Sequence, residues 1–371
     1  MLEKTPGAVV CGHCHALGAD ALCAFCRRPV HERCLESDRC PVPHPRELRL
    51  GMGWRLRDID EQGRVGRVTH VLGGEQVRDL ATRTEIAPLW PAPRHKDLPV
   101  AYLGPLAVGV DSLVRCAATY TLEETSDGTQ ITVYHDALLA HARVVSEAVE
   151  EVRLLERPVH DLADRLLLTR DGRTALLLSA SRFDIIDLTG RETRAVRVVD
   201  LRGEMVFDLA ILGEANLAAA AVFGRLRCFD LGSGQIRGSI PLDDQDVTAV
   251  ALGGGHVAAA TAELDLHVLE VGTGPPERWR RVLRTDIEAR GRIAPNQLAA
   301  SHDGRLVAVR HRRKRVQVIN LETGERQVLR GHTDTICHVR FISGGRTLVT
   351  ADDDNRVRFW PRSGDRLVTG D

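Results

Sequence analysis

The stretch that decides the fold is GHTDTICHVRFISGGRTLVTADDDNRVRFW, residues 331–360 of the 371-residue chain. Within it, short apolar runs alternate with polar residues and are separated by Gly, Asp and Asn. A two-residue period broken by turn-forming residues predicts antiparallel strands joined by tight turns. The same pattern extends from about residue 50 to the C-terminus, without a long helical period. We therefore expect an all-β body.

The Gly-His opening at Gly331, the FISGGRTLVTA segment and the closing Asp-x-x-Val-x-Phe-Trp resemble a repeat of the WD family. The resemblance implies a propeller blade with a structural tetrad formed by His332, Thr350, Asp354 and Trp360. In such a tetrad an aspartate in the tight turn accepts a hydrogen bond from the histidine, and the threonine and the tryptophan N–H complete the chain. A buried network of this kind stabilises a fold when every member has a partner. We interpret these residues as architectural, because no nucleophile accompanies the histidine and the acids.

The segment that ends this repeat recurs along the chain in weaker copies. Counting the last, seven equivalent positions lie at intervals of 40 to 56 residues: Asp79, His135, Asp187, Asp230, Glu270, Asn320 and Trp360. Repetition at this period is typical of propeller blades. We predict a seven-bladed β-propeller over residues 51–371, with six or eight blades as alternatives because the register is poor between residues 51 and 150. Residues 366–369 are expected to form the outer strand of the last blade, and residues 47–50 could add an edge strand.

The N-terminal segment has a different character, since six of the nine cysteines lie within the first 40 residues. The candidate metal ligands fall into four pairs: Cys11 and Cys14, Cys23 and Cys26, His31 and Cys34, Cys40 and His44. Such a pair can present both side chains to one ion, and two pairs complete the tetrahedral shell that zinc prefers. A segment this short buries too little apolar surface to fold alone, so bound metal would stabilise it. We predict a domain over residues 1–50 that holds two zinc ions, with His13 and His15 as competing ligands.

The order of these ligands resembles the cross-brace zinc fingers of the RING and PHD group, including the RING-like fingers of prokaryotes. The resemblance implies that one ion is shared by the first and third pairs and the other ion by the second and fourth pairs. RING fingers often recruit ubiquitin-conjugating enzymes through apolar residues, but Gly12 and His13 match that surface poorly. The tryptophan usual near the last cysteine pair of a PHD finger is missing. We therefore favour a protein-docking finger, with a RING-type ubiquitin-like ligase as the alternative function.

Composition limits the other possibilities. The chain carries 50 Lys and Arg against 51 Asp and Glu, and its net charge of -1 gives no general attraction to nucleic acid or anionic lipid. No apolar stretch approaches the roughly 18–20 residues of a membrane helix. No apolar core of signal-peptide length precedes Cys11. We expect a cytoplasmic protein that contacts neither membranes nor, in general, nucleic acid.

One basic run is conspicuous: Arg310, His311, Arg312, Arg313, Lys314 and Arg315. It could contact an anion or an acidic partner, but no aromatic residues accompany it for stacking on bases, and we interpret it as a solvated turn. The sequence has no phosphate-binding glycine loop, no Gly-x-Ser-x-Gly elbow and no metalloprotease helix motif. We therefore predict that the protein is not an enzyme. We expect an interaction scaffold, in which the finger and the propeller each bind protein partners.

Overall fold

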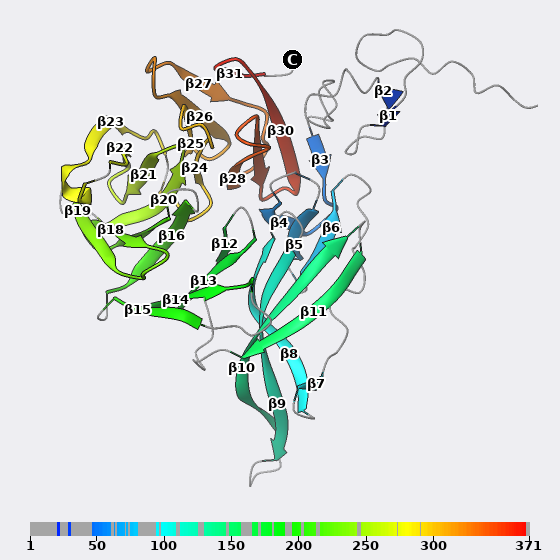
Figure 1. Cartoon of the computed structure of the whole chain (residues 1–371). Helices are drawn as coiled ribbons and strands as arrows, with labels where there is room; N and C mark the ends of the chain where they lie inside the picture. Colours follow the sequence, from blue (N-terminus) through cyan, green and yellow to red (C-terminus); the bar gives the residue numbers. More distant parts are fainter. Residues whose placement is uncertain are drawn as a thin grey trace, which may run out of the picture.

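The computed structural model describes residues 21–22, 29–30, 47–60, 63, 65–70, 72, 75–80, 94–95, 98–108, 112–124, 130–145, 148–156, 165–169, 172–179, 182–189, 195–201, 204–212, 216–242, 246–272, 274–289 and 291–368. Most of these residues belong to strands or to the turns between them (Figure 1). The helical element among them is the short 3-10 helix η3 (Pro276–Arg278). In this part of the chain no helix has the length and apolar character needed to cross a bilayer.

Four successive sheets are antiparallel meanders of four strands, in which each strand pairs with the next one along the chain. The first contains β12 (Arg165–Leu168), β13 (Thr174–Ser179), β14 (Arg182–Asp187) and β15 (Ala195–Asp200). The second contains β16 (Val206–Leu212), β17 (Leu217–Val222), β18 (Arg225–Asp230) and β19 (Ile236–Pro241). The third contains β20 (Val247–Gly253), β21 (His256–Thr261), β22 (Asp265–Glu270) and β23 (Arg280–Asp286). The fourth contains β24 (Leu298–Ala300), β25 (Leu306–His311), β26 (Arg315–Asn320) and β27 (Arg326–Leu329).

The last blade is completed by one strand from the N-terminal part of the chain and one from the C-terminal part. Strands β28 (Ile336–Ile342), β29 (Thr347–Asp352) and β30 (Arg356–Ser363) follow one another, and β3 (Glu47–Arg49) pairs with the beginning of β30. The short strand β31 (Arg366–Leu367) pairs with the end of β30. Both expected edge strands therefore form, and they divide the outer side of β30 between them. The propeller consequently begins at Glu47 and not at residue 51.

Two further sheets precede these blades. One has three strands, β4 (Trp54–Ile59), β5 (Val65–His70) and β6 (Glu75–Asp79). The other has five, in the order β11 (Ala148–Glu156), β10 (Gln130–Val145), β9 (Ser112–Glu124), β8 (Leu98–Val108) and β7 (Arg94–His95). The inner strands contact one another in the sequence β4, β8, β12, β16, β20, β24, β28 and back to β4, which closes a ring. In the N-terminal segment, β1 (Ala21–Leu22) pairs with β2 (Pro29–Val30).

The all-β propeller is thus confirmed, but the predicted number of seven blades is wrong. The described part of the chain has six blades: four have four strands, the last has five and one has three. The seventh position of the ring is filled by β8, which belongs to the long-stranded sheet β7–β11. Between β5 and β12 lies the sheet β7–β11, whose strands reach 16 residues and whose β9–β10 hairpin projects away from the ring (Figure 1). Neither β9 nor β10 contains a glycine or a proline, so no turn residue ends these strands at blade length. The intervals between equivalent repeat positions are long before Asp187, because the long strands of this sheet lie within them.

The hydrophobic core lies between neighbouring sheets. Phe183 of one blade meets Phe229 of the next, with ring centroids 4.9 Å apart and an edge-to-face geometry. Strand β17 reads LAAAAV and is buried throughout, because its alanines allow both neighbouring sheets to approach closely. Each fully buried large apolar side chain contributes about 1.5–3 kcal/mol, so these inter-blade layers stabilise the ring.

The Gly253-Gly254-Gly255 turn joins β20 to β21 and touches the adjacent blade. Gly254 and Gly255 both have positive φ, 49° and 76°, as a two-residue hairpin turn requires. A Cβ on Gly254 would lie 2.0 Å from the backbone nitrogen of Gly304 in the next sheet. Glycine is therefore needed here for close backbone approach as well as for turn geometry.

Candidate interaction surface

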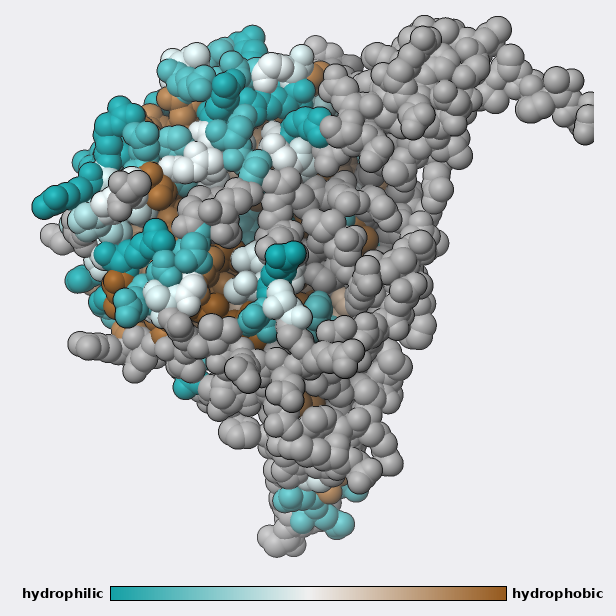
Figure 2. Space-filling model, viewed as in Figure 1, coloured by the Kyte–Doolittle hydropathy of each residue, from teal (hydrophilic) through white to brown (hydrophobic). Residues whose placement is uncertain are grey.

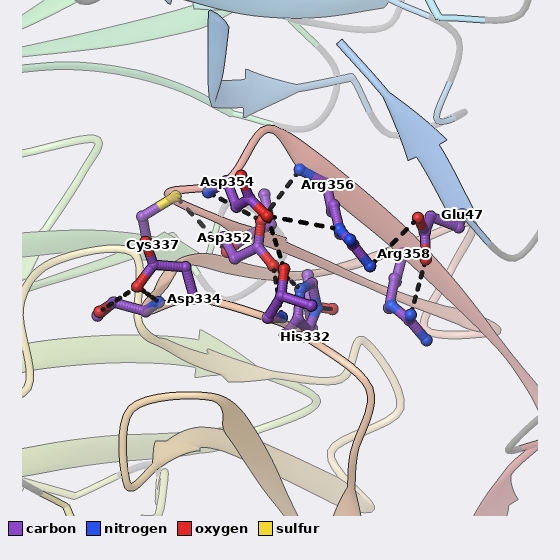
Figure 3. Close-up of polar contacts among 12 residues, drawn as sticks. Glu47, His332, Asp334, Cys337, Asp352, Asp354, Arg356 and Arg358 are labelled. Atoms are coloured by element: carbon purple, nitrogen blue, oxygen red, sulfur yellow. Dashed lines mark hydrogen bonds and ion pairs between the residues drawn. The ribbon is translucent and has the colours of Figure 1, made fainter. Parts of the chain in front are cut away.

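The last blade contains a buried polar network (Figure 3). The ring of His332 lies with Nδ1 2.8 Å from Asp352 Oδ2 and Nε2 2.6 Å from Thr350 Oγ1. Trp360 Nε1 donates to the same Thr350 oxygen at 2.8 Å. These contacts are all satisfied if His332 donates from Nδ1 and accepts the Thr350 hydroxyl proton at Nε2. The structure therefore brings together three of the four predicted tetrad residues, His332, Thr350 and Trp360.

The fourth member is Asp352, and the assignment to Asp354 is corrected. Besides His332, the Asp352 carboxylate accepts hydrogen bonds from the backbone N–H groups of Thr333, Asp354 and Arg356, at 3.2, 3.1 and 3.0 Å. The side chain of Asp354 is 54% exposed and accepts the Thr333 hydroxyl at 2.8 Å. Asp352 ends β29 with its side chain buried, whereas Asp354 lies in the following turn. Three consecutive aspartates give the sequence no means of choosing between these positions.

The electrostatics of this network suit a structural role. Burial raises the pKa of Asp352, but the hydrogen bonds from His332 and from the Arg356 N–H outweigh burial, and the pKa lies below its ordinary value. The carboxylate is therefore ionised at neutral pH and has its partners in the protein. Because His332 and Asp352 are both buried and paired, they are not available as an acid and a base for a substrate.

A second polar cluster holds β3 in the last blade (Figure 3). Glu47 pairs with Arg358 at 2.7 Å and with Arg356 at 3.7 Å. The Arg358 guanidinium in turn lies over the ring of Trp360, 5.9 Å from its centroid. These contacts supplement the backbone pairing of β3 and anchor the chain where it leaves the N-terminal segment.

The basic run from Arg310 to Arg315 is only partly a solvated turn. Arg310 is buried, and its guanidinium donates to Gln297 Oε1 at 2.8 Å and to the carbonyl oxygens of Gly291 and Arg292 at 3.0 and 2.6 Å. It therefore ties the loop before β24 to the blade. His311 is buried as well, so the first two residues of the run are structural.

The exposed members of the run are partly neutralised by acids. Arg312 pairs with Glu288 at 2.8 Å, and Arg313 lies 3.8 Å from Asp334. Lys314 is exposed. Pairing of this kind weakens the field that a polyanion would meet.

Polar side chains also join the inner strands of different blades. Arg165 of β12 forms an ion pair with the buried Asp208 of β16, and it donates to Asn296, which precedes β24, at 3.0 Å. This side chain therefore reaches across the middle of the ring. Burial lowers the pKa of Arg165 to about 10. Arg340 of β28 forms a similar ion pair with Asp58 of β4.

His338 lies near these ion pairs on β28 and is buried. Neither of its ring nitrogens has a hydrogen-bond partner. Burial lowers the pKa of His338 to about 4, so the ring is neutral at physiological pH. No sequence signal distinguished this histidine, since its environment is created by strands far apart in the chain.

Exposed large apolar side chains mark one end of the propeller. Met52 and Leu72 are 92% and 89% exposed, and Met205 and Phe223 are 66% and 67% exposed. Trp54 pairs with His70 and Val206 pairs with Val222, so each apolar pair lies just beyond the same end of a hairpin. Hydrophilic residues cover much of the described surface in Figure 2, with apolar colour in separate patches. Sequence reasoning missed these four residues.

We call this end of the ring the loop face. It carries the turns between the second and third strands of the blades and the segments that lead into their first strands, and its defining residues are Met52, Leu72, Met205, Phe223, Glu263, Arg312 and Asp353. Of the charged residues on this face, Glu263 and Arg312 are exposed and Asp353 is half-buried. The combination of apolar anchors with a polar surround is typical of protein-binding surfaces.

The predicted zinc ligands lie outside the described residues: Cys11, Cys14, Cys23, Cys26, His31, Cys34, Cys40 and His44. Within the described ranges, no group of three or more His, Cys, Asp or Glu side chains is arranged to hold a metal ion. Of the other cysteines, Cys116 and Cys228 are buried. Burial raises the pKa of Cys337 to about 12, so its thiol is unreactive at neutral pH.

A comparison with curated proteins gave no match to this chain. A comparison with protein-family models matched residues 324–361 to the family described as WD domain, G-beta repeat. This segment covers β27, β28, β29 and most of β30. It contains Thr350, Asp352 and Trp360 on these strands and His332 in the loop that precedes β28. The sequence match and the closed ring of sheets together support a β-propeller of the WD-repeat type.

Proposed function

We propose that this protein is a non-catalytic scaffold that binds protein partners on the loop face of its propeller. The observation that carries the proposal is the placement of Met52, Leu72, Met205 and Phe223, all highly exposed, at one end of the ring. Exposed apolar side chains lose unfavourable contact with water when a partner covers them. The His332–Asp352 pair, which would be the natural candidate for acid-base chemistry, is occupied within the blade.

The blade β16–β19 offers a matched test of the loop face. Replacing Met205 and Phe223 together by serine is expected to reduce retention of loop-face partners by tenfold or more, since each side chain contributes about 1–3 kcal/mol when buried in an interface. Ile236 is also exposed but lies at the β18–β19 turn, at the opposite end of the same blade. Ile236→Ser is therefore the control.

The measurement is affinity capture with the full chain, followed by titration calorimetry with each purified partner. Partners that bind wild type and the Ile236→Ser variant, but not the double variant, support the proposal. Equal affinity of all three proteins for every partner would contradict it.

We also propose that the residues before β3, 1–46, form a zinc-bound docking finger. The support is the spacing of the four ligand pairs, which suits two tetrahedral sites. The finger precedes β3 directly in the chain, and β3 is anchored in the last blade by pairing with Arg356–Arg358. One protein could in this way carry two separate binding modules.

Zinc content tests the finger. The purified chain is expected to contain two zinc ions, and His44→Ala is expected to lower the number to one, because the remaining three ligands of that site no longer complete its shell. His13→Ala is the matched control and is expected to retain both ions. The measurement is metal analysis by mass spectrometry. A metal-free chain would refute the finger, and loss of zinc on replacing His13 would reassign the ligands.

A further inference from the structure

Three basic residues stand side by side at the loop-face end of the blade β24–β27. In this sheet His311 of β25 pairs with Arg315 of β26, and Val316 of β26 pairs with Leu329 of β27. Arg330 is the residue after Leu329, so the register places it beside Arg315. We call His311, Arg315 and Arg330 the basic row. The first two belong to the basic run of the sequence, and the fold adds Arg330.

The positive charges of the basic row are not balanced by acids. Arg330 is exposed and Arg315 is half-buried, and within the part of the chain that the structure describes neither of them pairs with an acidic side chain. Glu288 lies beside the row, but Arg312 already binds its carboxylate at 2.8 Å. Like charges on directly opposite residues destabilise a sheet. An anion placed between Arg315 and Arg330 would relieve this repulsion.

The buried ring of His311 reports the same excess of positive charge. Burial is the largest cause of the lowered pKa of His311. Of the charges around the ring, Glu288 raises the pKa, whereas Arg312, Arg315 and Arg330 lower it. Three guanidinium groups and one carboxylate therefore act on one buried residue, and the surplus of positive charge attracts an anion to this corner of the loop face.

The turn that joins β25 to β26 beside the row is held in place on both sides. The Arg312 N–H donates to the carbonyl oxygen of Glu288 at 2.5 Å, and the Ile336 N–H donates to the carbonyl oxygen of Arg313 at 2.8 Å. The Arg313 side chain also donates to Thr335 Oγ1 at 3.0 Å. A surface whose backbone is already fixed loses less conformational freedom when a ligand binds.

We propose that the basic row, together with Arg312 and Lys314, binds an acidic segment of the protein partner that covers the loop face. The inference rests on the proposed function and names the partner's chemistry, a segment rich in Asp and Glu. In the ring of inner strands, β24 lies two places from β16 and two places from β4, so this blade stands midway between the two blades that carry the exposed apolar pairs. A partner that covers both pairs on this side of the ring passes over the row.

A carboxylate suits this site better than nucleic acid. The planar guanidinium group donates two parallel hydrogen bonds to a carboxylate, and two neighbouring arginines can bind successive acidic side chains. Residues 298–330, which form the blade, include no Phe, Trp or Tyr, so the blade has no aromatic side chain on which bases could stack.

A fluorescently labelled hexaglutamate peptide tests the site on the full chain. Fluorescence anisotropy at low ionic strength is expected to show binding to wild type that weakens as salt is added, and no binding of hexaglutamine. Replacing Arg315 and Arg330 together by glutamine is expected to weaken hexaglutamate binding tenfold or more. Arg278→Gln/Arg281→Gln is the matched control, since it removes the same charge from two exposed arginines near the start of β23, and it is expected to bind as wild type does.

Urea unfolding keeps the test independent of a folding defect. The Arg315→Gln/Arg330→Gln variant is expected to unfold at an equal or higher urea concentration than wild type, because the substitution removes a repulsion between like charges. Equal loss of hexaglutamate binding in both double variants would overturn the proposal, and so would the absence of binding to wild type. Tighter binding of a single-stranded oligonucleotide with six phosphates would overturn it in favour of nucleic acid.

The loop-face variants separate this inference from the proposed function. Met205→Ser/Phe223→Ser is expected to lose the protein partner but to bind hexaglutamate as wild type does. A partner whose affinity depends on Met205 and Phe223 but not on Arg315 and Arg330 would overturn the inference and leave the proposed function intact. Hexaglutamate binding that depends on the basic row, without any partner that depends on Met205 and Phe223, would support the anion site and contradict the proposed function.

Discussion

Replacing Asp352 by alanine is expected to lower the free energy of unfolding by about 3–5 kcal/mol. The substitution leaves four donors without their acceptor: the His332 ring and the backbone N–H groups of Thr333, Asp354 and Arg356. A buried donor left without a partner costs about 1–3 kcal/mol. Part of the loss is recovered by water at the exposed end of the turn. Urea unfolding followed by tryptophan fluorescence measures the change, because Trp360 belongs to the network.

Asp354→Ala is the matched control for this prediction. Its carboxylate is largely exposed and accepts one hydroxyl hydrogen bond, from Thr333, so we expect a loss of about 0.5–1 kcal/mol. Asp352→Asn is expected to fall between the two, because one oxygen acceptor remains. Equal destabilisation by Asp352→Ala and Asp354→Ala would show that the acidic member of the network had been assigned incorrectly.

Acid is expected to destabilise the protein through His338. In the folded chain burial lowers the pKa of this ring to about 4, whereas an unperturbed histidine titrates near pH 6.5. Between these values the unfolded chain binds a proton that the folded chain excludes, so the free energy of unfolding falls as the pH decreases from about 6.5 toward 4. One excluded proton costs about 1.4 kcal/mol per pH unit, which gives a loss on the order of 3 kcal/mol at pH 4.

The measurement compares wild type with His338→Gln and His338→Leu in urea unfolding at several pH values. Carboxylates such as Asp352 also lose stability in acid, so the informative quantity is the difference in slope between wild type and variant. Both variants are expected to show a flatter dependence below pH 6.5, because neither side chain titrates. Glutamine keeps a polar group and leucine does not, so a slope change common to both is due to the lost titration. Unchanged slopes in both variants would mean that His338 is protonated in the folded chain.

Sequence reasoning was most successful where the structural signal is local. The alternation in residues 331–360 predicts three strands, and β28, β29 and β30 follow it closely. The turn at Gly253-Gly254-Gly255 was also predictable, since adjacent glycines favour positive φ. The same reasoning miscounted the blades, because β9 and β10 contain no glycine or proline and continue well beyond the usual length of a blade strand.

The candidate site was predictable only in part. Spacing identified His332, Thr350 and Trp360, but the choice of Asp352 over Asp354 depends on which side chain points into the blade at the end of β29. The basic run appeared solvated, and yet Arg310 is buried against carbonyl oxygens of a loop some 18 residues away. The exposure of Phe223 was equally hidden, since an apolar residue beside a turn glycine looks the same whether a neighbouring blade covers it or not.

The sequence by itself determined the all-β character, the order of strands within each blade and the spacing of the cysteine pairs. These follow from periodicity and from contacts between residues close in the chain, which leave a direct trace in the order of amino acids. Only the tertiary structure decided how many sheets are blades and which polar groups are buried. Arg165 contacts Asn296, and His338 is buried, because strands more than 100 residues apart in the chain converge on one axis. The residue pattern of a single strand cannot predict this convergence.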